Sequence, residues 1–482
     1  MAKDYGKYFL KPDQKQARKR LKTAIEHHDY HAHFNVRHLG VGKHYLIQTY
    51  GCQGNEADTE TMKGILEQLS FTETSEETEA DIILLNTCAI RENAENRVFG
   101  ELGRLKQFKK HNPDLILGVA GCMPQEESVT ERLLQKYPYV DLIFGTHNIH
   151  KLPEYLETAV HQKERVVEVF SDQGSIIENL PKKRDHHTKA WVNIMFGCDE
   201  FCTYCVVPTT RGKERSRKPE HIIQEVEALA ESGYKEVTLL GQNVNAYGKD
   251  LADSQTTFAA LLSALQKTSI ARVRFTTSHP KDFDAETIAV LASGKNLMPH
   301  IHLPVQSGSD SVLKRMNRHY TKSDYLNLIA AIKKAMPDVS LTTDIIVGFP
   351  GETDDDFEAT LELVNTVGFE GAFTFIFSPR YQTPAASYQD DTPATVKHQR
   401  LQRLNQVINQ GYLIGNQRFL NQTVDVLVEG PSKNNAMVFA GYTAHNKLVN
   451  FTGSQSMIGE IVPVRITEAK TWFLKGVTIE KT

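Results

Sequence analysis

The stretch Met195-Phe-Gly-Cys-Asp-Glu-Phe-Cys-Thr-Tyr-Cys-Val-Val-Pro-Thr-Thr-Arg211 carries three cysteines with the spacing CxxxCxxC. These are Cys198, Cys202 and Cys205, and neither a fourth cysteine nor a nearby histidine completes a tetrahedral set. Three thiolates on one short loop suit a cubane iron–sulfur cluster with one iron left open. Because an open iron can bind a reactant, this stretch predicts a reaction site.

Zinc and disulfides are the alternative interpretations of the triplet. Structural zinc needs four protein ligands, and here the fourth would have to come from far along the chain. Disulfides are disfavoured because the sequence starts without an apolar leader, which is typical of a cytoplasmic protein whose thiols stay reduced. We therefore favour an iron–sulfur site in a cytoplasmic protein.

Length and composition predict several domains and no membrane association. A chain of 482 residues is too long for one ordinary core, and no apolar run approaches the roughly 20 residues of a membrane span. The net charge of -4 excludes a protein that is basic throughout, so nucleic-acid binding must come from local patches. Residues 1–43 form one basic extension, which we interpret as solvated and partly helical rather than as an RNA contact. Its clustered basic residues are Lys15, Arg18, Lys19, Arg20 and Lys22.

Residues 44–160 are predicted to form a parallel α/β domain, because short apolar strands alternate with amphipathic helices. The expected strands cover 45–50, 81–86, 116–120 and 142–144, and the expected helices cover 56–69 and 92–110.

Three further cysteines, Cys52, Cys88 and Cys122, come directly after three of these expected strands. Ligands of open parallel sheets bind outside the carboxyl ends of the strands, so the three thiols can converge although they are distant in sequence. Glycines beside Cys52 and Cys122 would let the backbone approach a bulky cluster. Free buried cysteines are the alternative. The division of all six cysteines into three plus three favours a second cluster.

A polar linker over 161–189 leads into a second repeating pattern, over 190–414. Six βα repeats predict a partial barrel whose active site lies at the carboxyl ends of its strands, and the CxxxCxxC triplet follows the first strand. The expected strands cover 191–195, 236–240, 272–276, 300–305, 340–347 and 372–377.

Residues 415–482 show a third pattern, in which short alternating strands are separated by Gly, Asn and Ser turns. This pattern predicts a small antiparallel β-barrel. Such a barrel could bind RNA or could serve only as a stability module, and the residues leave both possibilities open.

The motifs of the chain, taken in order, resemble those of the radical S-adenosylmethionine (SAM) methylthiotransferases. The resemblance covers about Tyr45 to Ile479 and departs from the family at Gly54, where methionine is common, and at Phe196, where an acid is frequent. The matching runs are Gly51-Cys-Gln-Gly-Asn55, Asn86-Thr-Cys-Ala-Ile-Arg-Glu-Asn93, Gly121-Cys-Met123, Gly197-Cys-Asp-Glu-Phe-Cys-Thr-Tyr-Cys205 and His302-Leu-Pro-Val-Gln-Ser-Gly-Ser309.

Three runs resemble the bacterial tRNA branch of the family, namely Cys202-Thr-Tyr-Cys-Val-Val-Pro208, Glu92-Asn-Ala-Glu95 and Leu239-Leu-Gly-Gln-Asn-Val-Asn245. That branch methylthiolates C2 of N6-isopentenyl (dimethylallyl) adenosine at position 37 of tRNA. Relatives that act on threonylcarbamoyl-adenosine in tRNA or on ribosomal protein S12 are the alternatives. A non-catalytic RNA-binding scaffold or iron–sulfur sensor is the alternative from another class, and it would need no cofactor pocket.

The resemblance implies two 4Fe-4S clusters and SAM as cofactors. Cys198, Cys202 and Cys205 would hold the cluster that binds SAM and cleaves it reductively to a 5'-deoxyadenosyl radical. The residues Cys52, Cys88 and Cys122 would hold a second cluster, which carries the sulfur. SAM would then be used twice, as methyl donor and as radical source.

The resemblance also implies contacts to SAM or substrate. Tyr204 would touch the adenine, although core packing is its alternative, and Ser278 would bond the ribose. Arg315 could instead cap a helix or pair with an acid, and the acidic run 354–356 is favoured to cap a helix rather than bind metal. The other implied contacts are Gly241, Gln242 and Asn243 to the methionine amine, Asp344 and Ile346 to the adenine, and Gln306 to either partner.

The expected partners are the anticodon loop of tRNA and an electron donor such as a flavodoxin or ferredoxin system; the sulfur source is open, and the protein is expected to be monomeric. The C-terminal barrel resembles the TRAM-like RNA-binding module that ends most family members, and the target base must leave its stack to reach a buried radical. Its candidate phosphate and stacking contacts are Lys433, Lys447, Arg465, Lys470 and Lys475, and Tyr442, Phe451, Trp472 and Phe473.

Overall fold

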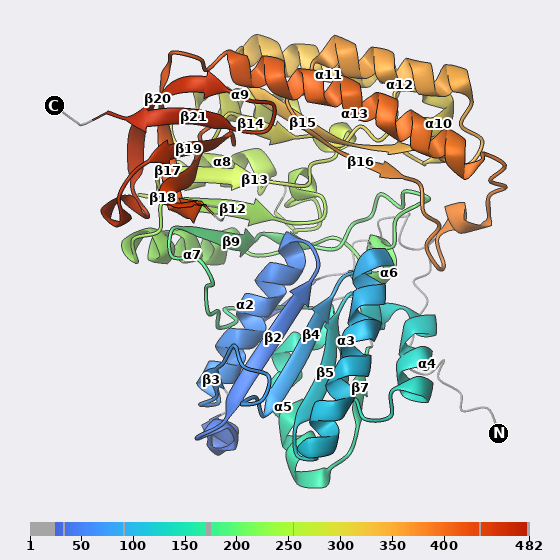
Figure 1. Ribbon diagram of the computed structural model, residues 1–482, viewed down its shortest axis with the longest axis vertical. Helices are drawn as coiled ribbons and strands as arrows, with labels where there is room; N and C mark the ends of the chain where they lie inside the picture. The colour runs from blue at the N-terminus through green and yellow to red at the C-terminus, as the bar shows by residue number, and fades with distance from the viewer. Residues whose placement is uncertain are drawn as a thin grey trace.

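The structure is a computed structural model that describes residues 25–31, 34–89, 92–169, 175–253, 255–432 and 435–479. Within this part, the chain forms an N-terminal α/β domain, a central half-barrel and a C-terminal closed β-barrel (Figure 1). The basic cluster from Lys15 to Lys22 and the predicted RNA contact Lys433 lie outside the described residues. The motif residues Ile90 and Arg91 lie outside them as well.

The N-terminal domain is a parallel sheet with the strand order β3-β2-β4-β5-β6-β7. Its central strands are apolar and buried because helices cover both faces: α2 and α5 cover one face, and α3 and α4 the other. The strands are β2 (His44–Tyr50), β3 (Thr72–Glu73), β4 (Ile82–Thr87), β5 (Ile116–Gly121), β6 (Leu142–Gly145) and β7 (Val166–Glu168). The helices are α2 (Gln53–Gln68), α3 (Glu92–His111), α4 (Glu127–Lys136) and α5 (Leu152–Glu157).

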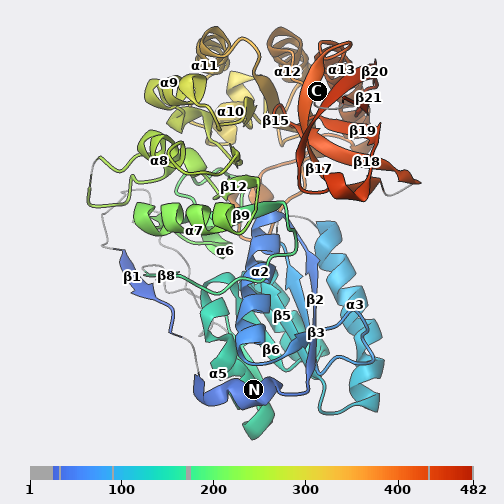
Figure 2. The same cartoon turned by 90° about the vertical axis from the view of Figure 1, so that its left-hand side faces the viewer.

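Parts of the predicted extension and of the predicted linker are ordered structure. Strand β7 lies within the linker and extends the sheet, and β8 (Ser175–Glu178) pairs in parallel with β1 (Glu26–Asp29) beside the domain (Figure 2). The 3-10 helix η2 (Phe34–Gly40) buries Val36 and Leu39 in the domain core. Pattern analysis misses these elements because they are short and lack a repeated apolar period.

No helix among the described residues is long and apolar enough to span a bilayer.

The half-barrel consists of two three-stranded parallel sheets, with the orders β13-β12-β9 and β14-β15-β16. The strands are β9 (Lys189–Asn193), β12 (Glu236–Leu240), β13 (Arg272–Phe275), β14 (His300–His302), β15 (Ser340–Val347) and β16 (Ala372–Ile376), with a hairpin of β10 (Met195–Phe196) and β11 (Arg215–Ser216). The helices are α6 (Val207–Thr210), α7 (Pro219–Glu231), α8 (Phe258–Leu265), α9 (Ala285–Ser293), α10 (Asp310–Arg315), α11 (Lys322–Ala335), α12 (Asp354–Val367) and α13 (Ala394–Gln417).

The C-terminal barrel closes in the order β17-β18-β19-β21-β20 and docks on the amino ends of the half-barrel strands (Figures 1 and 2). Arg272, at the start of β13, donates to the carbonyls of Tyr442 and Asp425, each at 2.9 Å. Arg274 donates to the carbonyls of Thr443 at 2.7 Å and Ala444 at 2.9 Å. The strands are β17 (Thr423–Ser432), β18 (Asn435–Thr443), β19 (Leu448–Thr452), β20 (Ile461–Ala469) and β21 (Leu474–Thr478).

Two of the predicted RNA contacts in this barrel are wrong. Lys447 is buried and forms an ion pair of 2.9 Å with Glu370 of the half-barrel. Phe451 belongs to the core of the C-terminal barrel. Lys447 is therefore covered by the half-barrel and Phe451 by its own barrel, so neither is available to RNA. Four of the other predicted contacts are exposed, namely Arg465, Lys470, Trp472 and Lys475.

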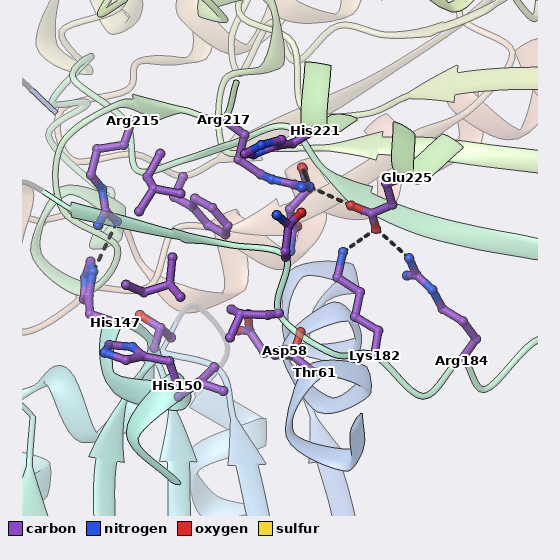
Figure 3. A pocket seen from close by; sticks show the side chains of 18 of the residues that line it. Asp58, Thr61, His147, His150, Lys182, Arg184, Arg215, Arg217, His221 and Glu225 are labelled. Carbon is purple, nitrogen blue, oxygen red and sulfur yellow. Dashed lines mark hydrogen bonds and ion pairs between the residues drawn. The ribbon is translucent and has the colours of Figure 1, made fainter. Parts of the chain in front are cut away.

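A buried ionic network fastens the linker to the half-barrel. Glu225 of α7 accepts from Arg184 at 2.6 Å, from Arg217 at 2.8 Å and from Lys182, and the three cations converge on this one carboxylate (Figure 3). Arg184 also pairs at 2.7 Å with Glu60 of α2. The network therefore joins the two domains through charges that are largely withdrawn from water.

We expect Glu225→Gln to lower the free energy of unfolding by about 3 kcal/mol, because three buried cations would lose their shared carboxylate. Urea denaturation followed by circular dichroism measures this change. The matched control is Glu227→Gln, an exposed position on the same helix, which should shift the value by less than about 0.5 kcal/mol. Equal shifts in both variants would contradict a role of the network in stability.

Candidate active site

The structure brings Cys52, Cys88 and Cys122 together at the carboxyl ends of three neighbouring strands, β2, β4 and β5. The backbone N–H of Cys88 donates to the carbonyl of Tyr50 at 3.0 Å, and that of Cys122 donates to Thr87 at 2.8 Å. These bonds continue the sheet ladder by one residue beyond each strand. The three loops therefore turn away from the sheet at the same level.

A pair of buried asparagines holds these loops. The Asn55 amide donates to Asn86 Oδ1 and to the Thr87 carbonyl, both at 3.2 Å, and Asn86 donates to the Asn55 carbonyl at 2.7 Å. Gly121, with φ of +100°, lies so close that a Cβ there would approach Asn86 Oδ1 to 2.4 Å. Gly54 is under no such constraint, since its Cβ would make ordinary contacts of 3.6 Å with Cys52 Sγ and Arg211.

The CxxxCxxC loop is fixed at both ends by the half-barrel. Gln242, at the end of β12, accepts from the Gly197 N–H at 2.6 Å, just before the first cysteine. At the other end, Thr203 Oγ1 donates to the Arg315 carbonyl at 2.9 Å, and the buried Arg318 donates to Cys202 Sγ at 3.4 Å. The loop therefore projects from the carboxyl end of the half-barrel, anchored by hydrogen bonds of Gly197, Cys202 and Thr203.

The two triplets meet at the junction of the domains. Val206, next to Cys205, packs against Ala89 and Cys122 in one buried apolar cluster. Arg211, which follows α6, donates from Nε to Cys122 Sγ at 3.2 Å and pairs through Nη2 with Asp58 Oδ2 at 2.6 Å. A residue from the loop of one triplet thus contacts a thiol of the other.

Burial and neighbouring groups shift the pKa values of the thiols in both directions. Burial raises the pKa of Cys198 well above its usual value and that of Cys205 to about 12. A hydrogen bond with Cys88 holds the pKa of Cys52 below its usual range, with Arg211 adding to the effect. Ligation needs thiolates, and buried thiolates are costly without a nearby cation. The irons of a bound cluster would supply that positive charge.

Neither triplet has the geometry of a site for a single ion. All six cysteines are free thiols. Within the described ranges, no three His, Cys, Asp or Glu side chains lie close enough to share one metal ion. A cubane distributes its three thiolates over three irons, so it asks for a wider spacing than one ion does. Three thiols on each triplet are the donor set of a cluster with one iron left open.

Buried polar atoms without hydrogen-bond partners lie at the carboxyl ends of β12 and β13. Ser278 Oγ and Asn243 Oδ1 are both buried and unpartnered among the described atoms. An unpartnered buried polar atom costs free energy unless a ligand or water meets it. These atoms suit a polar cofactor such as SAM. The contacts predicted for Gly241, Gln242, Asn243 and Ser278 stay predictions.

The remaining predicted contacts lie on the second sheet of the half-barrel. Tyr204 and Ile346 pack against the same apolar cluster, which contains Met316 and Phe349. Gln306, with φ of +70°, donates its N–H to the Asp344 carbonyl at 2.9 Å. These placements satisfy the core-packing alternative for Tyr204 and leave its contact to the cofactor a prediction.

Arg315 and the acidic run 354–356 have structural partners. Arg315 Nη2 donates to the Gly351 carbonyl at 2.9 Å and lies 3.7 Å from Asp356. Asp356 in turn forms a capping box with Thr353 at the start of α12. The helix-capping interpretation of the acidic run is confirmed, and the cofactor or substrate contact of Arg315 stays a prediction.

Sequence reasoning missed Arg211, Asp58 and Arg318. Each is a single charged residue whose partner is distant in sequence, so no local period or spacing reveals it. One signal was available: an arginine six positions after Cys205 and an aspartate six positions after Cys52 were both in motif-bearing segments.

We expect Arg211→Met to lower the free energy of unfolding of the apoprotein by about 3 kcal/mol, because Asp58 would stay buried without its cation. Urea denaturation measures the change. Arg403→Met is the control, since Arg403 pairs with Glu358 on the surface and such pairs contribute about 0–1 kcal/mol. If the two variants unfold at the same urea concentration, the Arg211–Asp58 pair does not hold the domains together.

Three family models match the chain. Residues 44–145 match the model described as uncharacterized protein family UPF0004, residues 192–364 match the radical SAM superfamily, and residues 417–479 match the TRAM domain. A solved radical SAM methyltransferase from Kitasatospora setae, TsrM, superposes with a TM-score of 0.53 at 14% identity, covering 71% of this chain and 75% of its own. At that identity, the superposition shows a shared fold.

Curated relatives match over nearly the full length. The tRNA-2-methylthio-N(6)-dimethylallyladenosine synthase of Oceanobacillus iheyensis is 59% identical over 99% of this chain and 93% of its own. The synthase of the same name from Bacillus licheniformis is 59% identical over 98% and 94%. With both cysteine triplets brought together in the fold, the chain belongs to the family of tRNA-2-methylthio-N(6)-dimethylallyladenosine synthases within the radical SAM superfamily.

Proposed function

We propose that this chain transfers a methylthio group to C2 of N6-isopentenyl (dimethylallyl) adenosine at position 37 of tRNA. The observation that carries the proposal is the contact between the two triplets, through Val206 and Arg211 on one side and Cys122 on the other. One triplet alone would suit many radical SAM enzymes. A second triplet beside it provides a place for the sulfur.

Each triplet would hold a 4Fe-4S cluster, and SAM would bind at Cys198, Cys202 and Cys205. When bound, these groups supply a 5'-deoxyadenosyl radical, a methyl donor and a transferable sulfur. The chain supplies position: Gln242 fixes the start of the radical-forming loop, and Arg211 fixes its end against the N-terminal domain. Unpartnered Ser278 Oγ and Asn243 Oδ1 would bind polar groups of the cofactor.

The C-terminal barrel would bind the tRNA. Exposed Arg465, Lys470 and Lys475 can contact phosphates, and exposed Trp472 can stack on a base. The barrel docks on the amino ends of the half-barrel strands, whereas the triplets lie at their carboxyl ends. The anticodon stem-loop would therefore extend along the outside of the half-barrel and deliver a flipped adenosine to the far end.

The proposed reaction also needs an electron donor and a compartment in which thiols stay reduced. Cleavage of SAM consumes one electron, which we assign to a flavodoxin or ferredoxin system. A monomeric protein in the cytoplasm, where thiols stay reduced and tRNA is available, completes the proposal.

We expect cells that lack this protein to accumulate isopentenyl-adenosine without the methylthio group, as measured by mass spectrometry of tRNA nucleosides. The wild-type gene should restore the product, whereas Cys202→Ala and Cys88→Ala should not. With purified, reduced protein and SAM, Cys202→Ala should also form no 5'-deoxyadenosine while it retains about half of the iron, because only the N-terminal cluster would remain. Restoration of the product by Cys202→Ala would overturn the assignment of the triplet.

We expect Arg465→Gln to weaken tRNA binding and to reduce the slope of log affinity against log salt by about 1, because one phosphate contact would be lost. Fluorescence anisotropy at several salt concentrations measures both. Lys163→Gln is the control: Lys163 is exposed in the N-terminal domain, away from the C-terminal barrel. An unchanged slope in Arg465→Gln would place the RNA elsewhere.

A further inference from the structure

Two large aromatic side chains are exposed on one face of β16, the edge strand of the second half-barrel sheet. Phe373 is 64% exposed and Phe375 is 45% exposed. The alternate residues Ala372 and Ile376 pack against the main core, and Thr374 donates to Asn405 of α13 at 2.6 Å. Because side chains alternate along a strand, Phe373 and Phe375 point away from α13, to the inner side of the half-barrel.

The neighbours of the pair confirm that this face is the inner one. Phe373 lies in register with Asp344 of β15, and Phe375 lies in register with Ile346. The ring of His302 on β14 stands edge-on to Phe373 with a centroid distance of 6.0 Å, and His302 Nε2 is 3.3 Å from Asp344 Oδ1. The inner face of this sheet is thus polar toward β14 and aromatic at its open edge.

One end of this aromatic edge lies near the CxxxCxxC loop. Ile346, beside Phe375, packs against the same cluster as Tyr204, which lies between Cys202 and Cys205. Beyond the carboxyl end of β16, a cavity of about 440 Å³ separates Arg380 and Tyr381 from Glu126, four residues after Cys122. Cavities of this size accommodate small-molecule groups.

Building on the proposed function, we propose that Phe373 and Phe375 form the wall that receives the N6-isopentenyl group of the target adenosine. The isopentenyl group is apolar and planar around its double bond, so it gains free energy by leaving water for two phenyl rings. A threonylcarbamoyl group carries a carboxylate, which would lose hydration against the same rings without compensation. The wall would therefore select the substituent as well as bind it.

The position of Phe373 and Phe375 on the inner face of the half-barrel indicates that their exposed rings bind a partner. Single exposed apolar residues are normal on protein surfaces. Here two phenyl rings share one face inside an open barrel, next to residues that flank the cysteine loop. A flipped adenosine at this place would lie beside the loop that carries Cys198, Cys202 and Cys205.

The test uses the cluster-loaded enzyme and two anticodon stem-loops, one with isopentenyl-adenosine at position 37 and one with adenosine. Fluorescence anisotropy gives the ratio of their affinities. We expect the wild type to prefer the isopentenyl form, and Phe373→Ala and Phe375→Ala each to reduce this ratio by about tenfold. Ile414→Ala is the matched control, because Ile414 is an apolar residue, 68% exposed, on α13 outside the half-barrel. It should leave the ratio unchanged.

Two results would overturn the inference. An unchanged ratio in both phenylalanine variants, or an equal loss of affinity for both stem-loops, would mean that these rings do not read the isopentenyl group. Product analysis separates this failure from failure of the proposed function. If the wild-type enzyme forms the methylthio product but the variants keep the wild-type ratio of affinities, only the proposed role of Phe373 and Phe375 is refuted. A wild-type enzyme that forms no product from the isopentenyl stem-loop refutes both.

Discussion

The buried ion pair of Arg211 with Asp58 determines how the two cysteine triplets face each other. Arg211 belongs to the loop of one triplet and Asp58 to the helix that starts at the other, and both are about 5% exposed. Removing two charges from water is expensive, and the cost is offset only while they stay in contact. The same guanidinium also reaches Cys122 Sγ at 3.2 Å. Any shift between the domains would therefore strand a buried charge.

The docking of the other two domains places the reaction site at the carboxyl end of the half-barrel. The C-terminal barrel covers the amino ends of the strands through Arg272 and Arg274, whose four hydrogen bonds all go to backbone carbonyls. The N-terminal domain covers part of the carboxyl end through Arg211 and Val206. Along the half-barrel, the edge strand β16 and its two phenylalanines are left for a substrate to approach.

The sequence predicted the elements that repeat and missed the contacts that join them. Strands β4 and β5 read as apolar runs, so their positions and the cysteines that follow them were predictable. Pairing of Arg211 with Asp58 depends on how two domains dock, and no local pattern encodes docking. Lys447 and Phe373 show the same limit. Lys447 was expected to contact RNA and is buried, and the expected strand over 372–377 did not reveal that Phe373 is exposed, because a local pattern does not tell which surfaces other parts of the chain cover.

Each triplet also receives one buried arginine, which would bear on the chemistry of a bound cluster. Arg318 donates to Cys202 Sγ at 3.4 Å and Arg211 donates to Cys122 Sγ at 3.2 Å. Hydrogen bonds to ligand sulfur and nearby charge are two of the factors that set the potential of an iron–sulfur cluster. A buried cation favours the form with the additional electron, because it stabilises negative charge where water is excluded. With clusters bound as proposed, the hydrogen bonds from Arg318 and Arg211 to ligand sulfur would favour the reduced state at each triplet, although Asp58 offsets the charge of Arg211.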